Sequence, residues 1–192
     1  MSESASVRGS WIENPASGER IRIRTSAADS GGEVLAWELR LAPGGRVPSG
    51  HVHPAQEERF TIVEGRMRFR VDGHSRVVGP GQTVTVAPGA RHHFANAGPN
   101  EAFVLVETRP AMRMEELLEV AAELARGRHG RARRLPGLVD LLLFMDEFRS
   151  EVRAPYFAGV VGLVVRAIVR VAGLFGAGGH YRRLRVTRGT GR

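Results

Sequence analysis

The sequence predicts a mainly β protein, an antiparallel sandwich or barrel followed by C-terminal α-helices. Between residues 19 and 110, short segments alternate apolar and polar residues and are separated by turns rich in Gly, Pro and Asn. This pattern is typical of antiparallel sheets that bury one face. After Pro110 the apolar residues recur with the period of an α-helix. A chain of 192 residues fits one such domain with an appendage.

Each predicted strand places one set of side chains in the core. Met67, Phe69 and Val71 face inward, whereas the arginines between them face solvent. Asp72–Gly73 is a hairpin turn signal, after which the chain returns as a further strand. The segments with strand character are Arg20–Arg24, Val34–Leu41, Glu57–Val63, Arg66–Val71, His74–Val78, Thr83–Val86, His92–Asn96 and Ala102–Thr108.

Three helices are predicted beyond the last strand, over Met114–Ala125, Leu138–Val152 and about Tyr156–Phe175. The third is almost entirely apolar, but Arg166 and Arg170 near its centre argue against a membrane span. We therefore expect this helix to pack against the barrel or across a homodimer interface. Contact with a membrane surface is the less favoured alternative.

The amino-acid composition excludes several kinds of chemical site. The chain has no cysteine, which excludes disulfides, zinc-thiolate sites and thiol catalysis. Any metal must therefore be held by nitrogen and oxygen ligands. The net charge of +8 comes mainly from the C-terminal third, yet the basic tail has no recognisable nucleic-acid-binding fold, so we expect no nucleic-acid partner. The polar N-terminus carries no signal-peptide pattern, which favours a cytoplasmic location.

His51 and His53 form the most informative motif, an HxH pair. Residues i and i+2 of a strand share one face, so the two imidazoles point into the same space. Four residues separate His53 from Glu58, and this spacer begins with Pro54. It is long enough for a turn that brings a third ligand back to the pair.

Strand parity separates ligands from their neighbours. Glu58 shares parity with the apolar residues of its strand, which must face inward, whereas Glu57 shares parity with polar residues. The same test places His92 inward with Phe94 and leaves His93 on the opposite face. Glu58 and His92 are therefore candidate ligands, and Glu57 and His93 are not.

The two blocks together resemble the paired motifs of the cupin superfamily. The first reads G-x5-H-x-H-x4-E-x6-G from Gly45 to Gly65, and the second reads G-x5-A-P-G-x2-H-x3-N from Gly81 to Asn96. Ala87 stands where many cupins have proline. The resemblance implies an antiparallel double-stranded β-helix, the jelly roll or cupin barrel. It also implies a metal site of three histidines and one carboxylate, formed by His51, His53, Glu58 and His92.

The resemblance also suggests how the chain is divided. We expect an N-terminal arm over residues 1–18, a cupin barrel over 19–110, a helical extension over 111–177 and a basic tail over 178–192. Most of residues 11–155 is similar to a group of bacterial single-domain cupins described as quercetin-dioxygenase-like. The segments that carry this similarity include IENPASGERIRIRTSAADSGGEVL, HVHPAQEERFTIVEG and RMEELLEVAAELAR.

This similarity implies a metal-dependent, dioxygenase-like oxygenase that acts on a small hydroxylated organic molecule. The cofactor is expected to be one divalent metal ion, with Fe(II) favoured and Mn, Ni, Co, Cu or Zn as alternatives. Glu58 is the candidate catalytic base. Five inward residues form either an apolar wall for the substrate or ordinary barrel core, namely Trp37, Phe60, Met67, Phe69 and Phe94.

Two other functions remain open at this point. A redox-inert metal in the same site would act as a Lewis acid, as in cupin isomerases and polyketide cyclases. Alternatively, the barrel is a non-catalytic sensor or binding module for a small molecule, with the helices as a partner surface. The identity of the bound metal, and whether activity depends on dioxygen, would distinguish these three functions.

Overall fold

In the computed structural model, the described residues are 9–47, 50–126 and 138–154, together with Ala167 and Tyr181. They form two antiparallel sheets and two helices, α1 (Met114–Arg126) and α2 (Leu138–Glu147). The larger sheet has the order β1-β2-β3-β9-β4-β7, with β1 (Ile12–Asn14), β2 (Glu19–Thr25), β3 (Leu35–Leu41), β9 (Ala102–Arg109), β4 (Glu57–Glu64) and β7 (Thr83–Val86). The smaller sheet has the order β6-β5-β8, with β6 (His74–Val78), β5 (Met67–Val71) and β8 (His92–Asn96).

The sequence pattern located the strands of this barrel well. Only β1 was missed, because three residues are too few to show an alternating pattern. The hairpin between β5 and β6 turns at Asp72 and Gly73, which have φ angles of 46° and 86°. Positive φ at both positions is what a tight hairpin requires, and an Asp-Gly pair adopts it at little cost.

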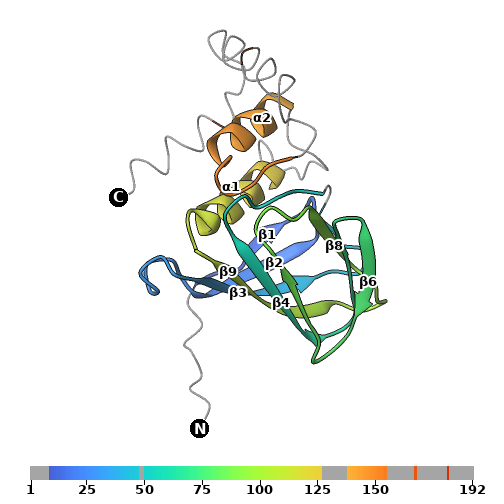
Figure 1. The fold of residues 1–192 in the computed structure, drawn as a ribbon. Coiled ribbons are helices and arrows are strands. Elements are labelled where there is room, and N and C mark those ends of the chain that lie inside the picture. Colours follow the sequence, from blue (N-terminus) through green and yellow to red (C-terminus); the bar gives the residue numbers. More distant parts are fainter. Residues whose placement is uncertain (1–8, 48–49, 127–137, 155–166, 168–180, 182–192) are drawn as a thin grey trace.

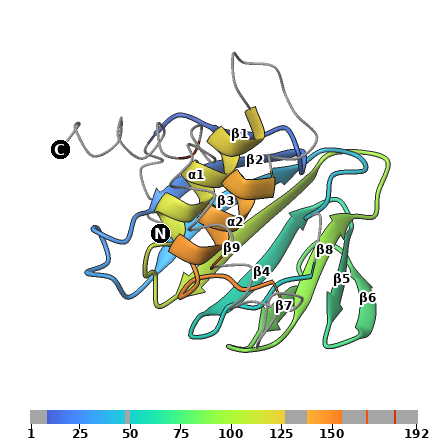
Figure 2. The same ribbon diagram turned by 90° about the horizontal axis from the view of Figure 1, so that it is seen from above.

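The two sheets enclose a common apolar core. Phe60 from the larger sheet packs against Phe69 and Phe94 from the smaller one, with ring centroids 5.1 and 5.3 Å apart. Phe69 and Phe94 lie 5.8 Å from each other, so the three rings form one cluster between the sheets. The result is the double-stranded β-helix that the motifs implied, and Figure 2 shows the smaller sheet on the side away from the helices.

The helices lie together at one side of the barrel, next to β1 (Figure 1). Helix α1 is amphipathic and buries Met114, Leu117, Val120 and Leu124. The junction that leads into α1 is fixed from inside by Gln56, whose amide nitrogen donates to the carbonyls of Pro110 and Ala111 at 3.0 and 3.1 Å. Neither helix in this part of the chain has the length and apolarity needed to span a bilayer.

Helix α2 is shorter than the sequence predicted. The predicted helix ran to Val152, but α2 ends at Glu147 and the chain then turns back toward the barrel. The amides of Glu151 and Val152 both donate to the Phe148 carbonyl, and Arg153 pairs with Val52 as an isolated antiparallel bridge. Periodicity alone could not show this turn, because the residues beyond Glu147 still alternate in a helix-compatible way.

Most of the third predicted helix and of the basic tail lies outside the described residues. Tyr181 is an exception, and it is buried against α2. Its hydroxyl donates to the carboxylate of Glu147, and its amide donates to Asp140 at 3.2 Å. At this position, therefore, the tail contacts the helical extension.

The aromatic cluster generates a stability prediction. Phe69→Ala removes a ring that is fully buried between the two sheets, so it should lower the free energy of unfolding by about 3–5 kcal/mol. Arg68→Ala on the outer face of the same strand is the matched control and should change it by less than about 0.5 kcal/mol. Urea unfolding followed by circular dichroism measures both. Equal losses from the two variants would contradict this assignment of the core.

Candidate metal centre

Three separate segments bring the candidate ligands together. His51 and His53 lie on the segment that precedes β4, Glu58 is the second residue of β4, and His92 is the first residue of β8. The backbones of His51 and His92 pair directly, with hydrogen bonds of 3.0 and 2.9 Å in the two directions. This bridge joins the first motif to the second, so the late histidine lies beside the HxH pair.

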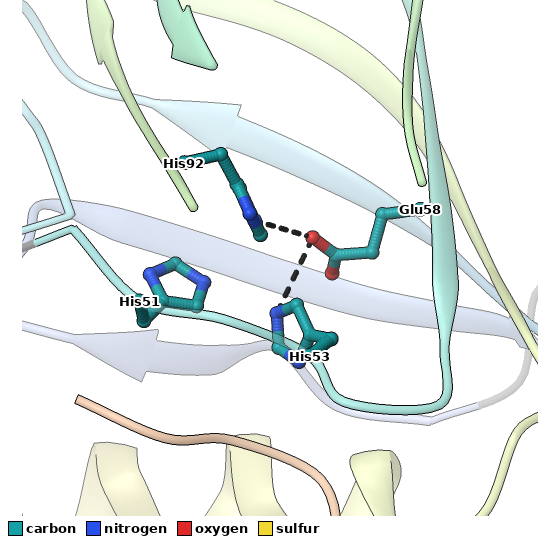
Figure 3. A group of neighbouring side chains, drawn as sticks. All are labelled: His51, His53, Glu58 and His92. Carbon is teal, nitrogen blue, oxygen red and sulfur yellow. Dashed lines mark hydrogen bonds and ion pairs between the residues drawn. The ribbon is translucent and has the colours of Figure 1, made fainter. Parts of the chain in front are cut away.

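The side chains of these four residues converge on one point (Figure 3). One ligand atom from each residue can be chosen so that all four lie within 4.8 Å of one another. Glu58 Oε2 is 2.9 Å from His92 Nε2 and 3.4 Å from His53 Nε2. Two ligands at right angles around a metal about 2.1 Å away are separated by about 3 Å. The arrangement is therefore compatible with a single metal ion.

Hydrogen bonds orient the imidazoles for this role. His53 Nδ1 lies 2.5 Å from the carbonyl oxygen of Glu151, and His92 Nδ1 lies 3.1 Å from that of Ala90. A carbonyl can only accept, so each Nδ1 donates in these bonds, and Nε2, which faces Glu58, is the nitrogen that can bind a metal once it carries no proton. This is the pattern that fixes metal-binding histidines in proteins.

The Glu58 carboxylate and the imidazole of His53 each stabilise the charged form of the other. Burial alone raises the pKa of the Glu58 carboxyl, but attraction to His53 and hydrogen bonds from His53 and His92 hold that pKa well below its usual range. Burial lowers the pKa of His53, but the Glu58 carboxylate and the Glu151 carbonyl raise it by more, so the net pKa is raised. Without metal, Glu58 is thus a buried anion held by imidazole donors, and a divalent cation would replace the proton on His53.

The neighbours of the ligands lie elsewhere. Glu57 is exposed on the outer face of β4, and the convergent group contains neither Glu57 nor His93. His93 faces outward beside Arg70 and Arg91; partial burial first, and then repulsion from these arginines, lowers its pKa. These two orientations follow the strand parity read from the sequence.

Two contacts of the site were not anticipated from the sequence. Thr108 is fully buried, and its hydroxyl lies 3.5 Å from Glu58 Oε1. Its parity with the inward residues of β9 was a signal that could have identified it. The Glu151 carbonyl carried no signal at all, because a backbone group 98 positions away from His53 along the chain has no side-chain signature.

The residues proposed as a substrate wall prove to be packed core. Trp37, Phe60, Met67, Phe69 and Phe94 are each at most 6% exposed, and the three phenylalanine rings pack on one another. Their position supports the interpretation as ordinary core. The histidines differ in exposure: His53 and His92 are buried, whereas His51 is only partly buried. His51 is therefore the candidate ligand nearest to solvent.

Comparison with known proteins supports a cupin domain. The family described as the Cupin domain matches residues 37–107, a stretch that includes all four candidate ligands. A solved structure described as a predicted oxalate decarboxylase from Thermotoga maritima is 20% identical, with a TM-score of 0.50, and the alignment covers 57% of this chain and 98% of that one. Identity this low shows the shared fold alone. The double-stranded β-helix and the described C-terminal helices are thus shown for this chain, and the match to the Cupin domain is confined to residues 37–107.

One curated relative resembles part of the barrel more strongly. It is described as the polyketide synthase CurC of Streptomyces cyaneus and is 34% identical over 70 residues. The match covers 36% of this chain and 45% of the relative, so it spans less than half of either protein.

The parity argument generates a matched test of the ligand assignment. Glu58→Gln keeps the size of the side chain but removes the buried charge, so it should weaken metal binding by more than the roughly 10–100-fold typical of outer-shell changes. Glu57→Gln makes the same chemical change one residue away, on the outer face, and should leave metal binding unchanged. Elemental analysis and competition with a chromophoric chelator measure both variants. Equal losses would show that the register of β4 is off by one residue.

The raised pKa of His53 predicts proton release on metal binding. Near neutral pH part of the metal-free protein carries a proton on His53, whereas Glu58 is already ionised and contributes none. Zn(II) must displace that proton, so its affinity should rise with pH through the pKa of His53. Calorimetry in buffers of different ionisation enthalpy detects the released proton. An apparent binding enthalpy that is the same in every buffer would contradict the prediction.

Proposed function

We propose that this protein is a metal-dependent oxygenase acting on a small hydroxylated organic molecule that can chelate a metal through two oxygen atoms, such as a catechol or the enol form of a β-diketone. The observation that supports it is the ligand set itself. Three imidazoles and one carboxylate surround a single point and include no sulfur, a combination that suits Fe(II) and similar metals. Four protein ligands leave positions open on a metal that prefers six.

His51, His53, Glu58 and His92 would hold the metal, which we propose to be Fe(II). When bound, such a metal supplies open positions for substrate oxygen atoms and for dioxygen. Glu58 Oε2 faces the imidazole nitrogens and is the natural ligand atom. Within the described part of the chain, its second oxygen, Oε1, has only the long contact with Thr108. This oxygen is the candidate to accept a proton from a substrate hydroxyl group.

The surroundings of the site fit a substrate that enters from the side of His51. The buried phenylalanine cluster fills the barrel interior and excludes water there. His51 is the ligand nearest to solvent, so an incoming molecule would reach the metal past its ring. Chelation by two oxygen atoms would then fix the substrate while its remaining body lies near the rim of the barrel.

A redox-neutral reaction is the second candidate, and one observation favours it. The curated relative that matches the barrel is described as a polyketide synthase, and polyketide chains are rich in enolisable carbonyl groups. In this version the metal polarises a carbonyl and Glu58 moves a proton, which leads to cyclisation or isomerisation without oxygen. Both candidates need the same ligands but differ in their dependence on dioxygen.

An oxygen-electrode assay separates the candidates. Protein loaded with Fe(II), Mn(II) or Ni(II) should consume oxygen with at least one member of a panel of flavonols, catechols and β-diketones. His51→Ala should abolish the uptake, whereas His93→Ala, which alters an outward histidine, should retain it. His51 is chosen because it is the least buried ligand, so its loss disturbs the fold least.

The other outcomes have defined meanings. Conversion of a β-diketone without oxygen uptake, under nitrogen and with Zn(II) bound, would overturn the oxygenase and favour the Lewis-acid enzyme. Saturable binding of a panel member without turnover under either atmosphere would instead favour a sensor or binding module.

A further inference from the structure

We propose that the segment Phe148–Arg153, directly after α2, is a strap that positions His53 for metal binding. Through this strap the helical extension would help to set the affinity and geometry of a site that otherwise belongs to the barrel. The inference rests on the proposed metal site and goes beyond it, because none of these six residues is a candidate ligand.

The first link is the hydrogen bond from His53 to the carbonyl of Glu151. At 2.5 Å it is short, and both groups are buried. It selects the tautomer that leaves Nε2 as the ligand atom, and it sets the rotation of the ring about its χ2 angle. His92 has an equivalent bond to Ala90, but that carbonyl is only two residues away on the same loop. Of these two imidazoles, only His53 depends on a distant part of the chain for its orientation.

The second link is the pairing of two backbones. Val52 donates to Arg153 and Arg153 donates to Val52, both at 2.9 Å, as in a short antiparallel ladder. Val52 stands between the two histidines of the HxH motif. The strap therefore holds the backbone between two candidate ligands as well as the ring of one of them.

The third link ties the strap to both helices. Phe148 is fully buried, and the Arg113 guanidinium lies 4.8 Å from the centre of its ring. Arg113 also forms an ion pair with Glu147 at 2.9 Å, which joins the start of α1 to the end of α2. A strap held at one end by the helices and at the other by Val52 has little freedom to drift from His53.

A segment that positions His53 and a segment that only packs against the barrel predict different results when the bridge to Val52 is removed. If the segment only covers apolar surface, removing the Val52 bridge should lower stability and leave the metal environment unchanged. If it positions His53, the same change should alter the ring tautomer, the metal spectrum and the affinity. Outer-shell partners of metal-binding histidines typically change affinity by roughly 10–100-fold.

Two substitutions at one position provide the test in the full-length chain. Both variants lose the exposed side chain and its hydrogen bond to the Arg149 carbonyl, but only Arg153→Pro also removes the N–H that donates to Val52. We expect Arg153→Pro to weaken Zn(II) binding by about tenfold or more, to shift the visible bands of the Co(II)-loaded protein and to reduce the Nδ1–H tautomer of His53 in nitrogen-15 NMR. Arg153→Ala should match the wild type in all three.

The wild-type protein offers a second measurement in case the proline variant does not fold. Linkage requires that metal stabilise the strap if the strap stabilises the metal site. Zn(II) should therefore slow hydrogen exchange at the amides of Glu151 and Arg153, relative to that of Leu117 in α1. Unchanged exchange at both strap amides, or a folded Arg153→Pro variant with wild-type affinity and spectrum, would overturn the strap.

The metal site itself is tested separately in the same series. His51→Ala removes a candidate ligand, so it should lose Zn(II) affinity whether or not the strap exists. Retained affinity in His51→Ala would overturn the proposed function. Lost affinity in His51→Ala together with wild-type behaviour of Arg153→Pro would overturn the strap alone.

Discussion

The buried carboxylate of Glu58 is the constraint on which the site and its surrounding strands depend. An ionised carboxylate inside an apolar barrel is costly unless charged or hydrogen-bonding partners compensate it. Here the compensation comes from His53 and His92, which arrive from two other segments. Their approach requires a particular register, in which Glu58 pairs with Val86 on one side and with Thr108 on the other. A slip by one residue would expose Glu58 and bury Glu57, so packing and chemistry select the same register.

The apolar core holds the groups of this polar site close to one another. Phe60 lies two residues beyond Glu58 on β4, and Phe94 lies two residues beyond His92 on β8. On each of these strands, one inward-facing side chain belongs to the metal site and the next inward-facing side chain belongs to the core. The phenylalanine cluster holds the two sheets at a fixed separation, and that separation keeps the carboxylate and the imidazoles within hydrogen-bonding distance.

The fold does not decide the reaction. The same barrel architecture occurs in a solved structure with only 20% identity, and barrels of this kind serve many chemistries. The C-terminal extension adds a segment after α2 that approaches the HxH pair at the edge of the barrel. Such additions alter solvent access and the orientation of ligands without changing the ligands themselves.

The sequence by itself determined the strands other than β1, the hairpin between β5 and β6, and the four convergent residues. Each of these is encoded locally: alternation in Glu57–Val63 separated Glu58 from Glu57, and Asp72–Gly73 marked a turn through its tolerance of positive φ. Only the tertiary structure decided where α2 ends and what orients His53. The turn after Glu147 exists because Arg153 pairs with a backbone about a hundred residues away, and the Glu151 carbonyl binds His53 through a group that every residue has. Local sequence patterns indicate which face of a strand a side chain occupies. Hydrogen bonds to distant backbone groups cannot be predicted in this way, because every residue has the same backbone groups.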